Sequence, residues 1–208
     1  MAKISDQENA RKSTYPIQSL ILNRWSPRAM SGQPMSDEEL MPLFEAARWA
    51  PSSFNSQPWR FIYAKRDTPN WGPLFDLLLE VNKQWCCNAA VLVLIISQKL
   101  FESNGKPSVT HSFATGSAWE NLCLEGAARH YVVHGMAGFD YEKARKVCQV
   151  PDDYQVEAMT AIGKKGNLAA LPEEMRKKEQ PSQRKPLREI IFEGQFAPSF
   201  AKKKNASS

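Results

Sequence analysis

The sequence lacks any apolar stretch long enough to cross a membrane as a helix. Its longest apolar run, Ala89 to Ile96, has eight residues, whereas a spanning helix needs about 20. The first 13 residues contain no apolar stretch of signal-peptide length and include Asp6 and Glu8, which is untypical of secretory and transit sequences. We therefore predict a cytoplasmic protein that does not bind membranes.

Cysteines, metal-ligand patterns and the common catalytic signatures are also scarce or absent. The four cysteines form no CxxC pair, which favours reduced thiols. His130 and His134 are four residues apart, but no third ligand stands at zinc-motif spacing, so we predict no metal site. The sequence has no GxSxG elbow, no HExxH, no Walker loop and no GxGxxG after a strand.

The composition is that of one folded domain. With 42% apolar and 24% charged residues in 208, the chain is neither disordered nor long enough for two ordinary domains. We expect an N-terminal arm over residues 1–13, a single domain over 14–196 and a basic, solvated tail over 197–208. Residues 164–208 carry a net charge of +6, yet no basic stripe with interleaved aromatics is present, so we predict no nucleic-acid binding.

Hydrophobic periodicity predicts long helices that alternate with few strands. The expected helices are 14–24, 36–48, 74–85, 112–131 and 141–148, and the expected strands are 59–65, 88–97 and 155–163. Ser36 and Glu39 form a capping-box pattern, although Pro42 should kink that helix or delay its start. The segment 186–196 is expected to be extended. This order predicts a central sheet wrapped by helices.

Two polar segments are harder to explain as core. The first, Asn23 to Arg28 (NRWSPR), places two guanidinium groups and a hydroxyl within five residues, which suits a phosphate group. Taken alone, these residues fit a capped helix end with solvated arginines better, because surface arginines are common.

The second polar segment is the loop Ala50 to Trp59 (APSSFNSQPW). Its short Ser, Asn and Gln side chains offer both donors and acceptors, which a planar heterocycle such as a flavin requires. The alternative is a turn whose polar side chains bond to their own backbone.

Several separated motifs together resemble the FMN-dependent nitroreductase family, and they occur in that family's order. They are RWSPR (24–28), EAARWAPSSFNSQPWRF (45–61), VHGMAGFD (133–140), AIG (161–163) and RKPL (184–187). The resemblance covers about residues 15 to 192 and implies an α+β sandwich around a mostly antiparallel sheet. It further implies an intertwined homodimer with one FMN in each of two interface clefts.

The resemblance also implies roles for particular residues. Arg24, Ser26 and Arg28 are expected to hold the FMN phosphate, ribityl chain and pyrimidine edge, and Arg184, assisted by Lys185, is a further phosphate contact. The loop 52–57 would reach the flavin from the other subunit, and the backbone of 136–138 would lie against its N5 and O4 edge. The implied cofactor-binding set is Arg24, Trp25, Ser26, Arg28, Ser52, Ser53, Asn55, Gln57, Met136, Ala137, Gly138 and Arg184.

The implied activity is hydride transfer from NADH or NADPH through FMN to a nitroaromatic, quinone or similar electron-poor acceptor, with no side chain as a catalytic group. Family members often carry an acidic residue where this chain has Ala137, which weakens inference about the substrate. Two alternatives remain open: a dehalogenating or flavin-consuming branch of the same fold, and a non-enzymatic flavin-binding or interaction module with a basic tail. Trp85, Cys86 and Cys87 are expected to be core.

Overall fold

The computed structural model describes residues 11–197. Most of the predicted N-terminal arm and all of the basic tail after residue 197 lie outside the described residues. The helices are α1 (Ser19–Asn23), α2 (Asp37–Arg48), α3 (Trp71–Phe75), α4 (Glu80–Cys86), α5 (His111–Ala128), α6 (Tyr141–Val147) and α7 (Glu173–Arg176). The strands are β1 (Trp59–Lys65), β2 (Val91–Gln98), β3 (Tyr131–Met136) and β4 (Tyr154–Lys164). Short 3-10 turns are η1 (Ser53–Asn55), η2 (Leu168–Ala170) and η3 (Leu187–Glu189).

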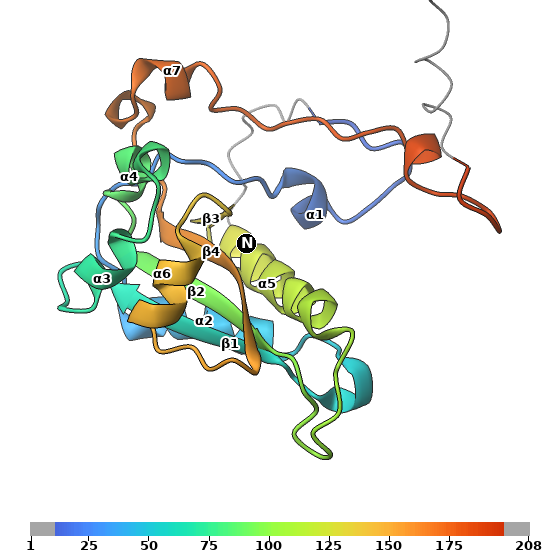
Figure 1. Ribbon diagram of the computed structural model, residues 1–208. Helices are drawn as coiled ribbons and strands as arrows, with labels where there is room; N and C mark the ends of the chain where they lie inside the picture. Colours follow the sequence, from blue (N-terminus) through green and yellow to red (C-terminus); the bar gives the residue numbers. More distant parts are fainter. Residues whose placement is uncertain (1–10, 198–208) are drawn as a thin grey trace, which may run out of the picture.

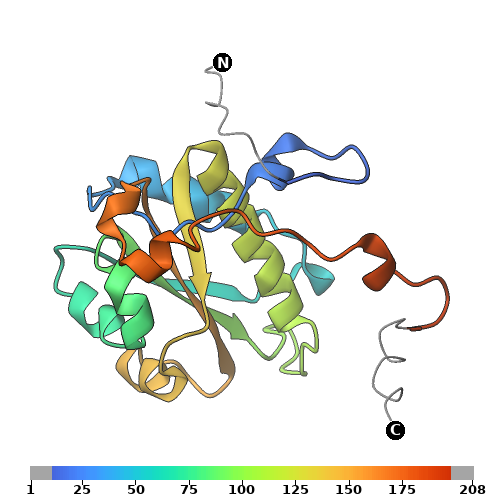
Figure 2. The same cartoon turned by 90° about the horizontal axis from the view of Figure 1, so that it is seen from above.

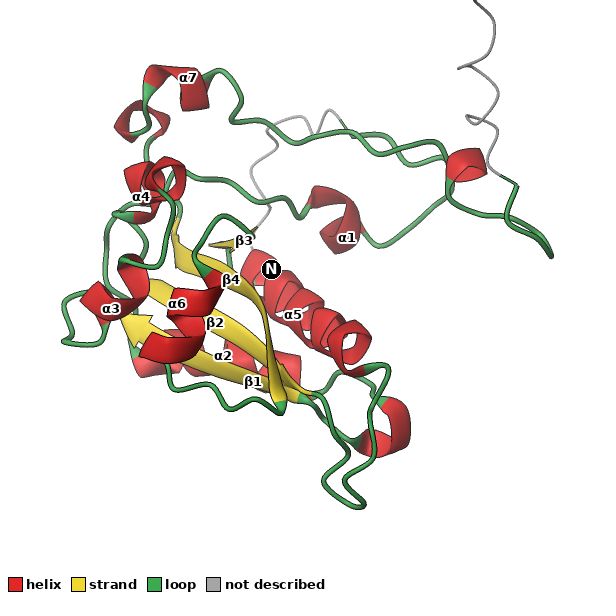
Figure 3. Ribbon diagram, viewed as in Figure 1, coloured by secondary structure: helices red, strands yellow, loops and turns green. Residues whose placement is uncertain are grey.

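A four-stranded antiparallel sheet in the order β1-β2-β4-β3 forms the middle layer (Figure 1). Strand β2 is buried on both faces, as its continuous apolar run predicts. Leu92, Leu94 and Ile96 face a core shared with α3, α4 and α6. Val91, Val93 and Ile95 face a second core shared with α2 and α5. Figure 3 shows these helices on the two faces of the sheet, and the α+β prediction is confirmed.

Helix α2 begins where the capping box predicts. The Ser36 hydroxyl accepts from the Glu39 amide at 3.3 Å, and a Glu39 carboxylate oxygen accepts from the Ser36 amide at 2.9 Å. The helix then runs as one element through Pro42, so the expected late start is wrong. The fully buried stripe of Leu40, Leu43 and Ala47 compensates for the one backbone hydrogen bond that proline removes.

Several predicted helices are shorter than expected. The predicted helix 14–24 is helical only from Ser19 to Asn23, which buries no residue. The predicted helix 74–85 is two helices, because the stretch between α3 and α4 pairs with residues 138–140 through a Leu78–Phe139 bridge. Helix α5 ends at Ala128, and His130 then takes a left-handed conformation (φ 61°) before β3. The sequence pattern did not predict strand β3, because the expected helix continued to residue 131.

The chain after β4 leaves the body of the molecule. It passes through α7 and then runs beside the segment that precedes α1, and Figure 2 shows its end extending beyond the rest of the fold. The predicted extended segment 186–196 contains η3 and no strand. We call residues 177–185, which cross over the segment after α1, the C-terminal strap. No helix among residues 11–197 is long and apolar enough to span a membrane.

The cysteines have different environments. Trp85 and Cys86 are buried as predicted, whereas the same prediction for Cys87 is wrong because its side chain is exposed; Cys123 is buried and Cys148 is half-buried. All four are free, and burial raises the pKa of Cys123 to about 12. Within residues 11–197 there is no group of three or more His, Cys, Asp or Glu side chains that could hold a metal ion.

Candidate functional site: a cationic cavity and two flanking segments

The segment after α1 is fixed on the end of the sheet. The Ser31 amide donates to the Lys164 carbonyl at 2.9 Å, and the Gly166 amide donates to the Ala29 carbonyl at 2.9 Å. His134 of β3 hydrogen-bonds to the Pro27 carbonyl at 2.8 Å, and because a carbonyl only accepts, Nδ1 carries the proton. These bonds hold residues 24–28 in one path.

Arg24 is oriented within this segment by two side chains. Its Nη1 donates to the Ser26 hydroxyl at 3.3 Å, and its Nε lies 3.4 Å from a Glu120 carboxylate oxygen on α5. The Arg24 side chain is only 14% exposed, so its charge is removed from most of the solvent. The alternative of a freely solvated arginine does not describe Arg24.

The C-terminal strap is attached to the same segment by one carboxylate. Glu179 accepts from the backbone amides of Arg28 and Ala29, the latter at 2.9 Å, and from the Arg28 guanidinium at 3.4 Å. Its side chain is 3% exposed. We call residues 24–28 the arginine-rich segment. The attachment at Glu179 carries the following residues of the strap, up to Arg184, across this segment.

Together these elements enclose a cavity of about 280 Å³. Its lining comes from four separate stretches of the chain: Arg11, Arg24, Trp25, Ser26, Arg28, His134, Lys178, Gln180, Ser182 and Arg184. Five of these side chains are cationic; Glu179 pairs with Arg28, and Glu120 pairs with Arg24. Burial, followed by the charges of Arg184 and Arg24, lowers the pKa of Arg11. The cavity therefore favours an anion, and forked guanidinium donors match phosphate oxygens.

Four residues of this cavity region were missed by the sequence patterns. Arg11, whose Nη1 donates to the Arg24 carbonyl at 2.7 Å, lies in the predicted arm. Lys178 and Glu179 lie in a stretch that reads only as a polar loop. His134 was considered only as a metal ligand; burial lowers its pKa despite the Pro27 hydrogen bond, so it is neutral at pH 7.

The loop 52–57 is strained and exposed. Phe54, Asn55 and Gln57 have φ values of 53°, 52° and 47°, and Phe54 is 95% exposed. The loop keeps its shape because the Gln57 amide donates to the Ser52 hydroxyl at 3.0 Å, while Ser53 contacts the Thr110 hydroxyl at 3.0 Å. Positive φ in Phe and Gln is unfavourable and often marks a functional segment. The turn alternative accounts for Ser52 and for Gln57, whose Nε2 donates to the Asn55 carbonyl at 3.2 Å, but not for the exposure of Phe54.

The segment 136–138 ends β3 and presents free backbone donors. Met136 is buried against Cys86, and Ala137 is exposed. The carbonyls of Ala137 and Gly138 both accept internal hydrogen bonds, from Phe139 and Leu79 respectively, each at 3.1 Å. Within the described chain, neither the Ala137 amide nor the Gly138 amide donates to a protein acceptor. Two neighbouring N–H groups are thus available to an outside acceptor.

The structure brings some of the predicted site residues together and leaves others apart. Arg24, Trp25, Ser26, Arg28 and Arg184 share the cationic cavity, and His134 joins it to the strand that ends at Met136. Ser53 contacts Thr110 before the start of α5, whereas Arg24 contacts Glu120, ten residues further and about 15 Å along the helix axis. Residues 52–57 line neither the cationic cavity nor a larger cavity on the other side of Arg24 and Trp25.

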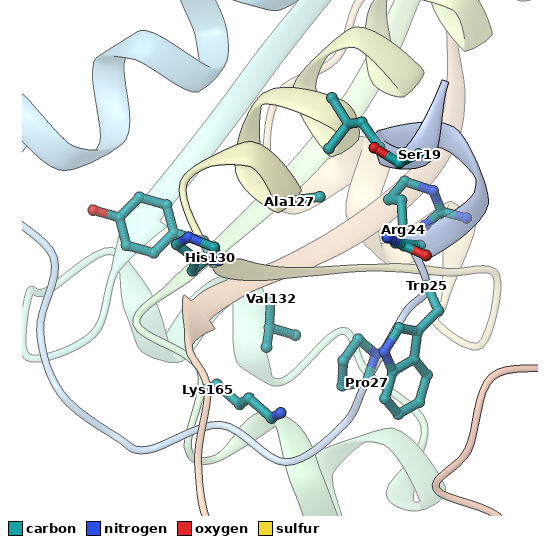
Figure 4. Close-up of a pocket in the computed structure, with 11 residues that line it drawn as sticks. Ser19, Arg24, Trp25, Pro27, Ala127, His130, Val132 and Lys165 are labelled. Carbon is teal, nitrogen blue, oxygen red and sulfur yellow. The ribbon is translucent and has the colours of Figure 1, made fainter. Parts of the chain in front are cut away.

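A second cavity of about 540 Å³ lies on the other side of Arg24 and Trp25 (Figure 4). It is bounded by α1, the end of α5 and the start of β3, and Figure 4 shows Val132 between His130 and Trp25. Leu20, Ala127 and Val132 make much of its wall apolar. The sequence patterns did not predict it.

Comparison with known proteins gives consistent similarities. The model of the Nitroreductase family matches residues 21–70, which include both the arginine-rich segment and the loop 52–57. The protein DrgA of Synechocystis sp. is 29% identical over 63% of this chain and 75% of its own length.

Solved structures match over more of the chain. One described as an oxidoreductase containing FMN is 41% identical, with a TM-score of 0.87, and the match covers 93% of this chain and 99% of that one. A nitroreductase family protein from Clostridium difficile 630 is 20% identical, with a TM-score of 0.65 over 85% of this chain and 97% of its own. This second likeness concerns the fold alone.

Proposed function

The chain belongs to the nitroreductase family, and from this membership we propose that it is an FMN-dependent oxidoreductase. It takes reducing equivalents from NADH or NADPH and passes them to a nitroaromatic, quinone or similarly electron-poor acceptor. The observation that carries the proposal is the cavity of about 280 Å³ in which Arg24, Arg28 and Arg184 converge. When bound, FMN supplies the hydride chemistry at its N5 atom.

The donor set of the cavity fits the phosphate end of FMN. Arg24, Ser26 and Arg184 supply charged and neutral hydrogen-bond donors, and Arg11 and Lys178 add positive charge. The Arg24 carbonyl, bound to Arg11, and the Pro27 carbonyl, bound to His134, are both occupied by internal donors. Phosphate oxygens would therefore meet N–H and O–H groups rather than carbonyl oxygens.

The flavin ring edge would lie against the end of β3. The unpaired amides of Ala137 and Gly138 provide N–H donors for its N5 and O4 atoms, and the exposed Ala137 side chain leaves that approach open. Arg28 brings a positive charge that favours the more negative, reduced cofactor. Glu179, 3.4 Å from Arg28, offsets part of that charge, so the tuning is weaker than an isolated arginine would give.

The remaining part of the site is supplied by a second copy of the chain. In one chain the loop 52–57 lies beside the start of α5, away from the cationic cavity, and its polar residues Ser53, Asn55 and Gln57 are exposed. A homodimer would complete the site if this loop of one subunit reached the cavity of the other. This arrangement also explains why a strained loop exposes Phe54.

An absorption spectrum of the purified protein tests the proposal, recorded before and after NADH or NADPH is added without oxygen. We expect bound oxidised flavin that bleaches, and subsequent reoxidation by a nitroaromatic or quinone. Flavin that binds but does not bleach with either reductant would favour the non-enzymatic binding module. A protein that stays colourless after reconstitution with FMN would overturn the proposal.

A further inference from the structure

A side-chain cluster outside the cofactor-binding set holds the backbone at Gly138. The cluster, which we call the α4 clamp, consists of Asn82 and Trp85 on α4 together with His134 on β3. We propose that the α4 clamp is a positioning device that aims the Gly138 N–H at the flavin edge. The clamp also connects this part of the backbone to the arginine-rich segment, residues 24–28. This inference rests on the proposed function.

Asn82 fixes the peptide after Gly138. Its Nδ2 donates to the Gly138 carbonyl at 2.9 Å, beside the Leu79 amide, which donates to the same oxygen at 3.1 Å. A peptide unit is planar, so a fixed C=O also fixes the N–H on the other side of the bond. The bond from Asn82 therefore sets the direction of the Phe139 amide.

The Phe139 amide passes this constraint to the preceding peptide. It donates to the Ala137 carbonyl at 3.1 Å, and that carbonyl shares a planar unit with the Gly138 N–H. The Asn82 side-chain amide, together with the Leu79 amide, thus fixes the direction of a backbone donor in the adjacent peptide unit. The Gly138 N–H is the group that would meet the flavin.

Trp85 determines how Asn82 is oriented. The Trp85 indole N–H donates to Asn82 Oδ1 at 3.3 Å, which leaves Nδ2 to face Gly138. Trp85 is 1% exposed, and its ring packs against His134 with centroids 4.5 Å apart. Since His134 Nδ1 donates to the Pro27 carbonyl at 2.8 Å, the clamp reaches the arginine-rich segment.

The clamp also explains why residue 138 is glycine. A Cβ at this position would come within 2.6 Å of Asn82 Nδ2, closer than real Cβ contacts. Close approach of the flavin ring is another reason for a small residue here. Only the first reason predicts that the cost of alanine at position 138 depends on Asn82.

The first test replaces Asn82 with Leu, which is similar in shape and has no donor. We expect the FMN dissociation constant to change less than about threefold, because the phosphate contacts remain. The flavin absorption maxima and the midpoint potential should shift, and the Phe139 amide, which donates to the Ala137 carbonyl, should exchange with solvent about tenfold faster in the cofactor-free protein. Trp85→Phe should shift the same quantities in the same direction by less, and the exposed Val81→Ala on the same helix should shift none.

The second test is a double-mutant cycle on the melting temperature of the cofactor-free protein. Gly138→Ala should destabilise the wild-type background but cost little in an Asn82→Ala background, which removes the clashing amide. Equal losses in both backgrounds would show that Asn82 is not the reason for glycine.

The outcomes separate this inference from the proposed function. If the wild-type protein binds no FMN, the proposed function and this inference fall together. If it binds FMN and Asn82→Leu leaves the flavin spectrum, the potential and the exchange of the Phe139 amide unchanged, the clamp proposal alone is overturned.

Discussion

The cationic cavity and the loop 52–57 both belong to the proposed site, yet the chain treats them differently. The cavity is assembled inside one chain: Glu179 is 3% exposed, and Arg24 is bonded to Ser26 and Glu120. The loop is strained at three residues and exposes Phe54 almost fully. The two regions thus differ in what holds them: contacts within one chain hold the cationic cavity, whereas the proposed function requires a second copy of the chain for the role of the loop.

The largest expected effect comes from separating the two parts onto different chains. One chain carries Arg24→Ala and Arg184→Ala, and the other carries Ser52→Gly, Ser53→Gly and Asn55→Gly. Each homodimer should bind FMN poorly. Co-expression should restore FMN to about a quarter of all sites, because half of the dimers are mixed and each has one intact site.

The flavin content of all co-expressed dimers measures this recovery; purification through two different tags isolates the mixed dimers, in which half of the sites should hold FMN. A site formed within one chain would give no recovery, and that result would remove the homodimer from the proposal.

The next largest effect concerns the cavity alone. Arg24→Ala should weaken FMN binding by about 1–3 kcal/mol, or about 5- to 150-fold, because a charge-assisted phosphate contact is lost. Fluorescence titration with FMN measures it. Arg48→Ala removes an exposed arginine that pairs with Glu45 and should leave the affinity unchanged. Equal affinities in both variants would contradict the phosphate assignment.

Glu179→Ala tests the attachment of the C-terminal strap. The variant leaves the Arg28 and Ala29 amides without their acceptor, at a cost of about 1–3 kcal/mol in local stability. Hydrogen exchange should accelerate at these two amides and through the strap. Glu173→Ala, whose partner is the exposed Lys177, should not change it. Unchanged protection in Glu179→Ala would mean that other contacts hold the strap.

A smaller effect is expected from pH. Burial holds the pKa of His134 below its ordinary value of about 6.5, so the unfolded chain binds this proton first. The free energy of unfolding is therefore expected to be complete above about pH 6.5 and to fall as the pH drops below that value. Denaturant titrations at pH 7 and pH 5 should show a smaller decline for His134→Gln than for the wild-type chain. A decline of the same size in both would contradict the buried neutral imidazole.

The smallest effect on stability is expected in the loop. Asn55→Gly keeps a residue that accepts positive φ, so the melting temperature should change by less than about 2 °C. The spectrum of bound FMN should still change, because the amide is removed. A lowered melting temperature with a normal flavin spectrum would instead support a structural turn.

Local patterns predicted most of the sheet and part of the site. Strand β1 has the predicted bounds, β4 differs by one residue at each end, and α2 begins at its capping box. In each case the signal lies within neighbouring residues: alternating burial, β-branched and aromatic side chains, or a Ser and a Glu three apart.

The features that the sequence patterns missed depend on distant contacts. Glu179 binds a segment 151 residues earlier, and His134 binds a carbonyl 107 residues earlier. The break between α3 and α4 exists because Leu78 and Leu79 pair with the stretch after β3. Strand β3 follows helix α5, which ends at Ala128 and is followed by a left-handed histidine, His130, rather than by a glycine. The sequence therefore contains no local signal for the end of this helix.

The C-terminal strap has a consequence for the rate at which the cofactor leaves. Arg184 and Lys178 lie on the strap, and Arg24 and Arg28 lie beneath it, so an occupant of the cavity would be held between two segments. Detachment of the strap at Glu179 would then remove one of these two segments and speed the release of the occupant. Affinity changes at this site should consequently appear in the dissociation rate, and a protein loaded with FMN should retain it through lengthy dilution.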